Sequence, residues 1–337
     1  MRNVAVIFLI MTTAAAGFGD EEFSRPGLSL DGAWEFRLDR DNVGEAEGWF
    51  NPPVSFPDSV QVPGAWDAQG FGDETAKLYH NFIGKGWYRR TVAIPEDWQG
   101  RRIFLCFGGV YRSAKIWVNG QLVGSHLGYV SDFEFDVSSH AAPGHSIDVV
   151  VLVDSEQRWN EDALQGCMDI IDHLFTYWGG IWSHVTLEAR SSAWIQDVFV
   201  EPRTDPAGCV VTAAVQGELS RPRRVLLDIC DAAGVRVASK QQDAAADGRI
   251  RVEMDLPGAR PWTPESPYLY AAHAVVEGES NTVLDRVETR FGLRTIEIRG
   301  TDFYVNGAKY YLNGYGDDCV YPDTIAPPAD RQFYVDR

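Results

Sequence analysis

The chain has 337 residues and is acidic, with 30 lysines and arginines against 48 aspartates and glutamates and a net charge of −18. That length predicts two or three domains rather than one. An acidic surface repels phosphate backbones, so the charge argues against nucleic acid as a partner.

The first residues predict a secretory signal peptide over residues 1–19. Arg2 precedes a short apolar run from Val4 to Met11, and residues 14–17 are small. This order of charge, apolar core and small residues is typical of export signals. The apolar run is shorter than the about 20 residues of a membrane-spanning helix, and no later segment is apolar enough to span a membrane. The chain is therefore expected to be secreted or periplasmic, with no membrane span.

Alternating apolar residues from about Leu28 onward predict short strands. Ile103, Leu105 and Phe107 alternate, and Asn119-Gly120 supplies the two residues with positive φ that a type I′ hairpin turn requires. Further strands are predicted over 133–137, 147–153 and 185–189. Short strands separated by Gly, Pro and Asp turns predict a β-sandwich over residues 26–190.

A second set of strands begins near Ser191 and predicts another sandwich over residues 191–292. Strands are expected over 195–201, 209–216, 225–231, 249–256 and 268–277. The stretch has the size of an immunoglobulin-like sandwich, which is about 100 residues.

The pattern changes again from Arg294. A hairpin turn at Asn306-Gly307 is followed by a strand over Tyr310–Leu312, a Pro-rich loop and the start of a helix at Asp330. A strand, a loop and a helix start are the opening of a β/α unit. Residues 293–337 are therefore expected to begin a (β/α)₈ barrel, which they are too few to complete because a barrel needs about 250 residues.

The five cysteines are scattered and contain no CxxC pair, so neither a zinc site nor a redox pair is predicted. Cys209 and Cys230 could pair across neighbouring strands, but free buried thiols are favoured. The histidines show no HExxH spacing, and no calcium-binding loop is present. No metal and no cofactor are therefore expected.

An ordered series of motifs carries a family resemblance. In the first predicted sandwich the series contains Leu30–Trp34, Val62–Trp66, Gly86–Arg90, Phe107–Val110, Trp117–Gly120, Phe133–Val137 and Gly179–Trp182. It continues with Trp262–Tyr270, Phe291–Arg294 and Leu312–Gly314. The whole series, from residue 28 to 337, resembles glycoside hydrolase family 2, which includes β-galactosidases, β-glucuronidases and β-mannosidases. The resemblance implies a mostly β fold: a jelly-roll-like sugar-binding sandwich, an immunoglobulin-like sandwich and the first strand of a (β/α)₈ barrel.

The same motifs can also be explained by packing and backbone geometry, without a catalytic role. Trp34, Trp66 and Trp87 are large enough to be packing anchors. The paired glycines at 108–109 and 179–180 mark bulges or close backbone approaches.

The resemblance implies a retaining exo-glycosidase that hydrolyses terminal β-linked sugars. Such enzymes use two carboxyl groups about 5–5.5 Å apart. In this family both are Glu residues on late barrel strands, and the acid/base Glu follows an Asn. The Asn-Glu pair of this chain, Asn160-Glu161, lies in the first predicted sandwich and is interpreted as a polar loop pair. No catalytic residue is therefore expected in these 337 residues, and the chain alone is expected to be inactive.

The loop between Trp159 and Trp182 carries the first candidate substrate contacts, Asp169, Asp172 and His173. The resemblance implies that an acidic residue of this loop binds the terminal sugar, and Asp172 is the best positional match. An ordinary interdomain loop is the alternative.

Asp317 and Asp318 are the second candidate substrate contacts. They follow the first barrel-like strand, and barrel active sites form at the C-terminal ends of strands. The family often has a His-Glu-Asp run here, where this chain has Gly-Asp-Asp. A loop-capping role for one of the two is the alternative.

Two other functions remain open from the sequence. One is a non-catalytic carbohydrate-binding protein built from the two sandwiches, and the other is a structural or adhesive ectodomain. The expected partner of an enzyme or a binding protein is a carbohydrate with a terminal β-linked sugar. The sequence leaves a homo-oligomeric state open.

Overall fold

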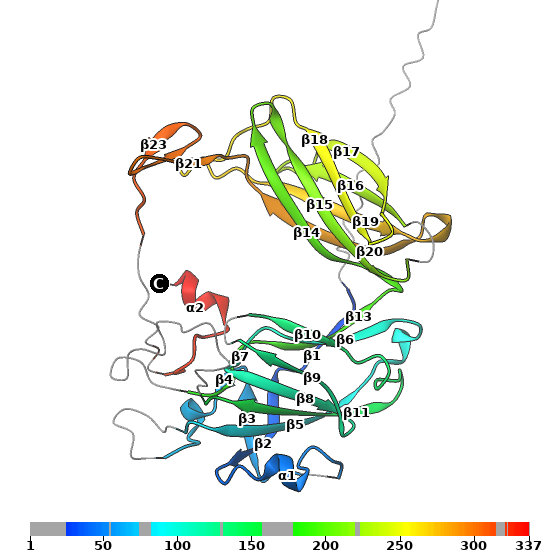
Figure 1. The fold of residues 1–337 in the computed structure, drawn as a ribbon, viewed down its shortest axis with the longest axis vertical. Coiled ribbons are helices and arrows are strands. Elements are labelled where there is room, and N and C mark those ends of the chain that lie inside the picture. The colour runs from blue at the N-terminus through cyan, green and yellow to red at the C-terminus, as the bar shows by residue number, and fades with distance from the viewer. Residues whose placement is uncertain are drawn as a thin grey trace, which may run out of the picture. The chain divides into compact units, whose positions relative to one another are not determined.

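The computed structural model describes residues 25–53, 55–73, 82–128, 131–156, 178–219, 223–314, 321 and 323–336. The fold is mostly β, as predicted. The described residues form two compact units (Figure 1). One unit combines residues 25–192 with the C-terminal residues from Asn313 onward, and the other contains residues 193–312. None of the helices in the described part of the chain has the length and hydropathy of a membrane-spanning segment.

The described residues of the first sandwich form thirteen strands and three short helical turns. These are β1 (Gly27–Ser29), β2 (Gly32–Asp39), α1 (Gly44–Glu47), β3 (Asp58–Val62), β4 (Gly64–Ala65), η1 (Asp67–Gln69), β5 (Lys85–Ala93), η2 (Glu96–Trp98), β6 (Arg102–Phe107), β7 (Val110–Tyr111), β8 (Ser113–Val118), β9 (Gln121–Leu127), β10 (Phe133–Asp136), β11 (Ser146–Asp154), β12 (Gly180–Ile181) and β13 (Val185–Arg190). They form a four-stranded sheet in the order β1-β13-β6-β10 and a six-stranded sheet in the order β3-β2-β5-β11-β8-β9. A small third sheet has the order β4-β12-β7.

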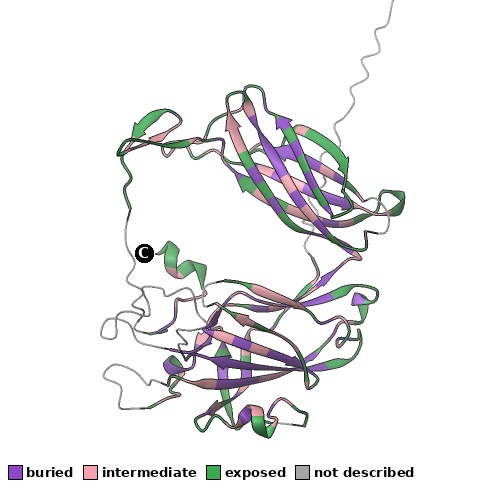
Figure 2. Ribbon diagram, in the orientation of Figure 1, coloured by how far each residue is buried: buried purple, intermediate pink, exposed green. Residues whose placement is uncertain are grey.

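The core of this sandwich follows the alternation in the sequence. Ile103, Leu105 and Phe107 of β6 are buried in it, whereas Arg102 is exposed. Figure 2 shows buried segments along the strands of this sandwich. The hairpin at Asn119-Gly120 is confirmed: both residues have positive φ, 52° and 79°, and β8 pairs directly with β9.

The three predicted tryptophan anchors are all buried, but they do not share one core. Trp34 and Trp66 lie in the main core between the sheets. Trp87 lies in a second cluster with Trp49 and Trp117, because it alternates along β5 with Tyr88, which faces the main core. The centroid of the Trp87 ring lies 5.9 Å from that of Trp49 and 5.4 Å from that of Trp117.

The second unit contains an immunoglobulin-like sandwich of two antiparallel sheets. Its elements are β14 (Ala193–Thr204), β15 (Ala207–Gly217), β16 (Arg224–Cys230), β17 (Arg236–Asp243), β18 (Arg249–Asp255), β19 (Tyr270–Glu277), η4 (Glu279–Asn281) and β20 (Val283–Phe291). The sheet orders are β14-β15-β18 and β17-β16-β19-β20. Cys209 and Cys230 are both buried free thiols, as favoured from the sequence, and burial raises the pKa of Cys209 to about 11.

A three-stranded meander follows the sandwich: β21 (Ile296–Arg299), β22 (Asp302–Val305) and β23 (Ala308–Tyr310). The predicted turn at Asn306-Gly307 is confirmed, with φ of 51° and 77°. The predicted strand over Tyr310–Leu312 has different bounds. Because a two-residue turn pairs Val305 with Ala308, the return strand begins at Ala308 and ends at Tyr310. The predicted helix start is α2 (Arg331–Val335), whose N-terminus is capped by the Asp330 carboxylate. That this region opens a barrel stays a prediction.

Candidate functional site

The predicted substrate contacts lie outside the described residues. This applies to Asp169, Asp172, His173, Asp317 and Asp318, and to the Asn160-Glu161 pair. The described residues that flank these segments in the chain are Glu156 and Trp178 on either side of the first, and Gly314 and Tyr321 on either side of the second. The candidate site is therefore the part of the first sandwich on which both segments end.

The small sheet β4-β12-β7 forms the base of this site. The central strand, β12, follows Trp178 and Gly179 in the chain. Its Gly180 pairs with Ala65 of β4 on one side and with Tyr111 of β7 on the other. Three short strands, each from a different part of the sequence, thus fix the backbone of β12, just after residues 157–177 in the chain.

Only glycine fits at the two positions that enter β12. A Cβ on Gly179 would lie 1.9 Å from Cζ2 of Trp66, whose own backbone N–H donates to the Gly179 carbonyl at 2.9 Å. Gly180 has a φ of 149°, and a Cβ there would lie 2.4 Å from the Gly64 carbonyl oxygen. The predicted close backbone approach at 179–180 is therefore confirmed.

A buried carboxylate lies directly beside this approach. Asp67, at the start of η1, is 2% exposed. Its Oδ1 accepts a hydrogen bond from the Phe82 backbone N–H at 3.0 Å, and its Oδ2 accepts one from the Gly179 N–H at 2.9 Å. Burial raises the pKa of Asp67 to about 7, although backbone hydrogen bonds from Gly179, Phe82 and its own N–H act in the opposite direction. The carboxyl group therefore titrates near neutral pH.

The C-terminal segment packs against the same base. Ile325 and Ala326 are buried in an apolar cluster with Ala65, Tyr111 and Trp178. The rings of Tyr111 and Trp178 lie 4.3 Å apart between centroids, with an angle of 31° between their planes. Figure 1 shows α2 and the segment that leads into it beside β4 and β7.

Ile325 occupies this cluster at a conformational cost. Its φ is 61°, in the left-handed region that β-branched residues rarely adopt. Its backbone N–H donates to the Tyr321 carbonyl at 2.7 Å, which closes a tight turn. The side chain is 6% exposed, so its burial offsets the unfavourable backbone conformation.

Replacing Ile325 with alanine is expected to detach the segment that leads into α2. Deletion of most of a buried Ile side chain costs about 2–5 kcal/mol, and alanine keeps the unfavourable φ. Limited proteolysis is expected to cut residues 323–336 faster in this variant than in the wild type. Val335→Ala is the matched control, because Val335 is 65% exposed. Equal cleavage rates for the wild type and Ile325→Ala would contradict the anchoring role.

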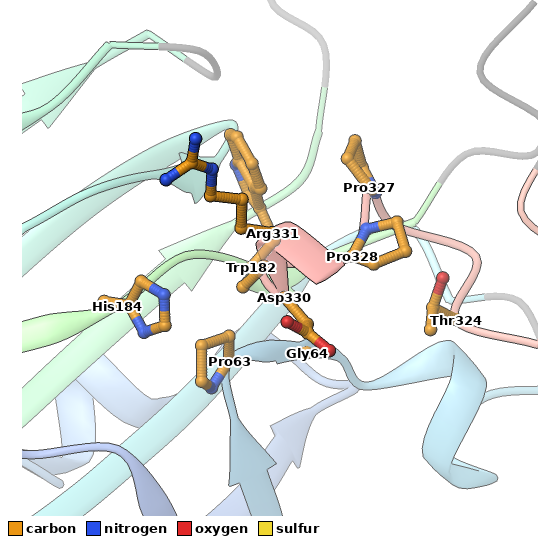
Figure 3. Close-up of a pocket in the computed structure, with 10 residues that line it drawn as sticks. Pro63, Gly64, Trp182, His184, Thr324, Pro327, Pro328, Asp330 and Arg331 are labelled. Atoms are coloured by element: carbon orange, nitrogen blue, oxygen red, sulfur yellow. The ribbon is translucent and has the colours of Figure 1, made fainter. Parts of the chain in front are cut away.

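A cavity of about 590 Å³ lies between the sheet edge and this segment (Figure 3). Its walls are mostly apolar, and the lining residues are Pro63, Gly64, Trp182, His184, Thr324, Pro327, Pro328, Ala329, Asp330 and Arg331. An aromatic ring with a few polar groups at this volume suits a small polar ligand such as a sugar.

Several of the polar lining groups already have partners. His184 Nδ1 lies 2.6 Å from the Asp31 carboxylate, and Asp330 accepts a hydrogen bond from the Gln332 N–H. Among the described lining residues, Asp330 is the one carboxylate. The described lining residues therefore do not include the paired carboxyl groups of a retaining glycosidase. In the described ranges, no cluster of three or more His, Cys, Asp or Glu side chains could hold a metal ion.

Asp67 and Ile325 were not predicted from the sequence. Asp67 follows the Val62–Trp66 motif, and a single aspartate after a strand is usually a solvated turn residue. Ile325 stands in a Pro-rich stretch without periodicity. The roles of both residues come from contacts with residues far away in the sequence, and no local sequence pattern predicts such contacts.

Comparison with known proteins identifies the class. The model of the family 2 glycosyl hydrolase sugar-binding domain matches residues 28–190, and the model described as glycosyl hydrolases family 2 matches residues 193–294. These matches fall on the two sandwiches in the order found in the structure. The two consecutive sandwiches are thus those of a glycoside hydrolase. The chain belongs to glycoside hydrolase family 2.

Relatives and solved structures agree with this assignment. A β-glucuronidase of Paenibacillus borealis is 29% identical over 314 residues, which cover 89% of this chain and 50% of the relative. A β-galactosidase of Thermoanaerobacter pseudethanolicus is 27% identical over 252 residues, or 73% of this chain and 33% of the relative. The crystal structure of Ruminococcus gnavus β-glucuronidase has a TM-score of 0.73 and 26% identity over 86% of this chain and 48% of that one. The chain thus spans half or less of the length of these proteins.

Proposed function

We propose that this chain is the N-terminal, accessory part of a retaining exo-glycosidase that removes terminal β-linked sugars. The proposal rests on two consecutive family matches. The sugar-binding domain model matches residues 28–190, and the family 2 model matches residues 193–294. The β-glucuronidase relative matches along 89% of this chain but only 50% of its own length. In this proposal the catalytic Glu pair is supplied by a barrel that lies beyond residue 337.

Two buried acidic side chains among the described residues, Asp67 and Asp39, are not available for catalysis. A retaining mechanism needs one carboxylate free to attack the anomeric carbon and one carboxylic acid free to protonate the leaving oxygen. Asp67 and Asp39 are buried, and each accepts hydrogen bonds from two backbone N–H groups. Neither can reach a substrate without loss of those bonds. We propose that the 337 residues alone have no hydrolase activity, because the matched family models lie on the two sandwiches and the β-glucuronidase relative is about twice as long as the matched region.

The substrate class proposed here is a terminal β-hexoside or β-hexuronide, since the relatives are named β-galactosidases and β-glucuronidases. We also propose that the protein is exported and is either secreted or periplasmic. This location rests on the charge, apolar run and small residues of the first 17 positions.

The test compares this chain with the protein encoded by the extended reading frame. Both are assayed with p-nitrophenyl β-D-glucuronide and β-D-galactoside. The extended protein is expected to hydrolyse at least one of the two, and the 337-residue chain neither. Replacement of the downstream acid/base Glu by Gln is expected to lower kcat by a factor of about 10² or more. A stop codon directly after Arg337, or an extended protein without glycosidase activity, would overturn the proposal.

A carbohydrate-binding role without catalysis is the second candidate, and the cavity beside Trp182 favours it. Calorimetric titration of the 337-residue chain with methyl β-D-glucuronide and methyl β-D-galactoside tests this role. Binding that is lost in Trp182→Ala would support it. The absence of heat from both ligands would exclude it for these sugars.

A further inference from the structure

Burial of a carboxylate without a cationic partner is unfavourable, and Asp67 has no such partner among the described residues. It is 2% exposed, and within the described ranges no Lys, Arg or His side chain forms an ion pair with it. Asp148 of the same sandwich shows the usual solution: it is also largely buried, but one carboxylate oxygen lies 2.9 Å from Arg89 Nε. Burial of an unpaired charge is strongly unfavourable unless hydrogen bonds compensate for it. The hydrogen-bond partners of Asp67 therefore indicate what its burial achieves.

The two oxygens of Asp67 bind two distant points of the backbone. Oδ1 accepts from Phe82, 15 residues away in the sequence, and Oδ2 accepts from Gly179, 112 residues away. Phe82 is the first described residue after segment 74–81, and Gly179 is the second after segment 157–177. One side chain thus holds the ends of two segments in a fixed relation.

The surroundings of Asp67 turn this link into a rigid junction. The carbonyl of Gly179 accepts from the Trp66 N–H, so both the N–H and the C=O of Gly179 are hydrogen-bonded. The Trp66 ring also packs near Phe82, with 6.5 Å between centroids. Trp178, which precedes Gly179, stacks on Tyr111 and contributes to the cluster that buries Ile325.

We propose that Asp67 is a positioning residue of the candidate site: its carboxylate fixes the backbone of Phe82 and Gly179 relative to each other. Its importance for catalysis rests on the proposed function, since the resemblance assigns sugar contacts to segment 157–177. The positioning itself is a property of this chain and needs no activity to be tested.

The ionisation of Asp67 makes the junction sensitive to pH. The charged carboxylate accepts both backbone hydrogen bonds strongly, whereas a protonated carboxyl group has less capacity to accept. The titratable group of β5 that faces Asp67 is the buried phenol of Tyr88, whose pKa the Asp67 charge helps to raise. That phenol stays neutral at physiological pH, so of these two groups Asp67 is the one whose protonation changes near neutral pH.

Amide hydrogen exchange in the 337-residue chain tests the positioning. In Asp67→Asn the exchange of the Phe82 and Gly179 amides, corrected for intrinsic rates, is expected to accelerate by about tenfold or more at pH 8, because a hydrogen bond to an ionised carboxylate is lost. In the wild type the same two amides are expected to lose protection between pH 8 and pH 6.

Asp39→Asn is the matched control. Asp39 is 3% exposed and accepts from two backbone N–H groups, those of Val43 at 2.8 Å and Gly44 at 2.9 Å. Its replacement is expected to affect these two amides and to leave Phe82 and Gly179 unchanged.

Two results would overturn the proposal. One is unchanged protection of Phe82 and Gly179 in Asp67→Asn. The other is an equal loss of protection throughout the sandwich, which would make Asp67 merely structural. If the variant does not fold, the pH series on the wild type decides by itself, and constant protection of both amides from pH 6 to 8 counts against the proposal. Each of these results is independent of whether the extended protein proves to be a glycosidase.

Discussion

Replacement of Gly179 by alanine is expected to destabilise the first sandwich by more than about 3 kcal/mol, at the upper end of what overpacking in a core costs. The added Cβ would lie 1.9, 2.2 and 2.5 Å from Cζ2, Cη2 and Cε2 of Trp66. The indole has no room to retreat, since it is 0% exposed and lies against Gly86, where a Cβ would be 2.6 Å from Cζ3. The backbone must therefore move, which lengthens the hydrogen bonds of Gly179 to Trp66 and Asp67.

Urea unfolding followed by tryptophan fluorescence measures this effect, because the buried Trp34, Trp66 and Trp87 all belong to the first sandwich. Gly314→Ala is the control: a Cβ there meets nothing within 4 Å, and its φ is not in the left-handed region. The control is expected to change the free energy of unfolding by less than about 0.5 kcal/mol. A similarly small change for Gly179→Ala would show that the sheet edge can relax, and the proposed rigid junction would lose its basis.

The elements that could be predicted are those whose signal is local. Asn119-Gly120 and Asn306-Gly307 require positive φ at both positions, and both hairpins form where the sequence predicts them. The alternation of Ile103, Leu105 and Phe107 is dictated by the pleat, since one face of β6 meets the core. The resemblance to glycoside hydrolase family 2 added the order of the sandwiches, which the two family models confirm.

Two strands of the second sandwich that the sequence did not predict, β17 and β20, lack such a signal. β17 (Arg236–Asp243) is an edge strand, and most of its residues are exposed, so its sequence does not alternate. β20 (Val283–Phe291) mixes charged with apolar residues. Both form because β16 and β19 offer free backbone hydrogen-bonding groups, not because their own residues favour a strand.

The candidate site was predicted only as a region. The resemblance directs attention to the chain before Gly179-Gly180, and the structure places the ends of two segments there, at Phe82 and Gly179. The residue that joins them, Asp67, could not be recognised, because its importance comes from burial and from two long-range hydrogen bonds. In a sequence, a buried aspartate and a solvated one look the same.

The stability of the first sandwich is expected to fall as the pH rises from about 4 to 8, through the ionisation of Asp67. The pKa of this group is raised from its ordinary value of 3.8 to about 7 in the folded protein. The fold therefore binds the proton more tightly than the unfolded chain does, so the stabilisation is complete below pH 3.8 and is lost as the pH passes through about 7. At about 1.4 kcal/mol per pKa unit, the total loss is on the order of 4 kcal/mol.

The measurement is the free energy of unfolding at pH 5 and pH 8 for the wild type and for Asp67→Asn. Other groups titrate in this range, so the difference between the two proteins isolates the contribution of Asp67. The neutral asparagine is expected to remove most of the pH dependence and to make the variant the more stable protein at pH 8. At that same pH its Phe82 and Gly179 amides are expected to exchange faster. The combination of higher global stability with weaker local order distinguishes a positioning residue from a structural one, and the same pH slope in both proteins would show that Asp67 is not the titrating group.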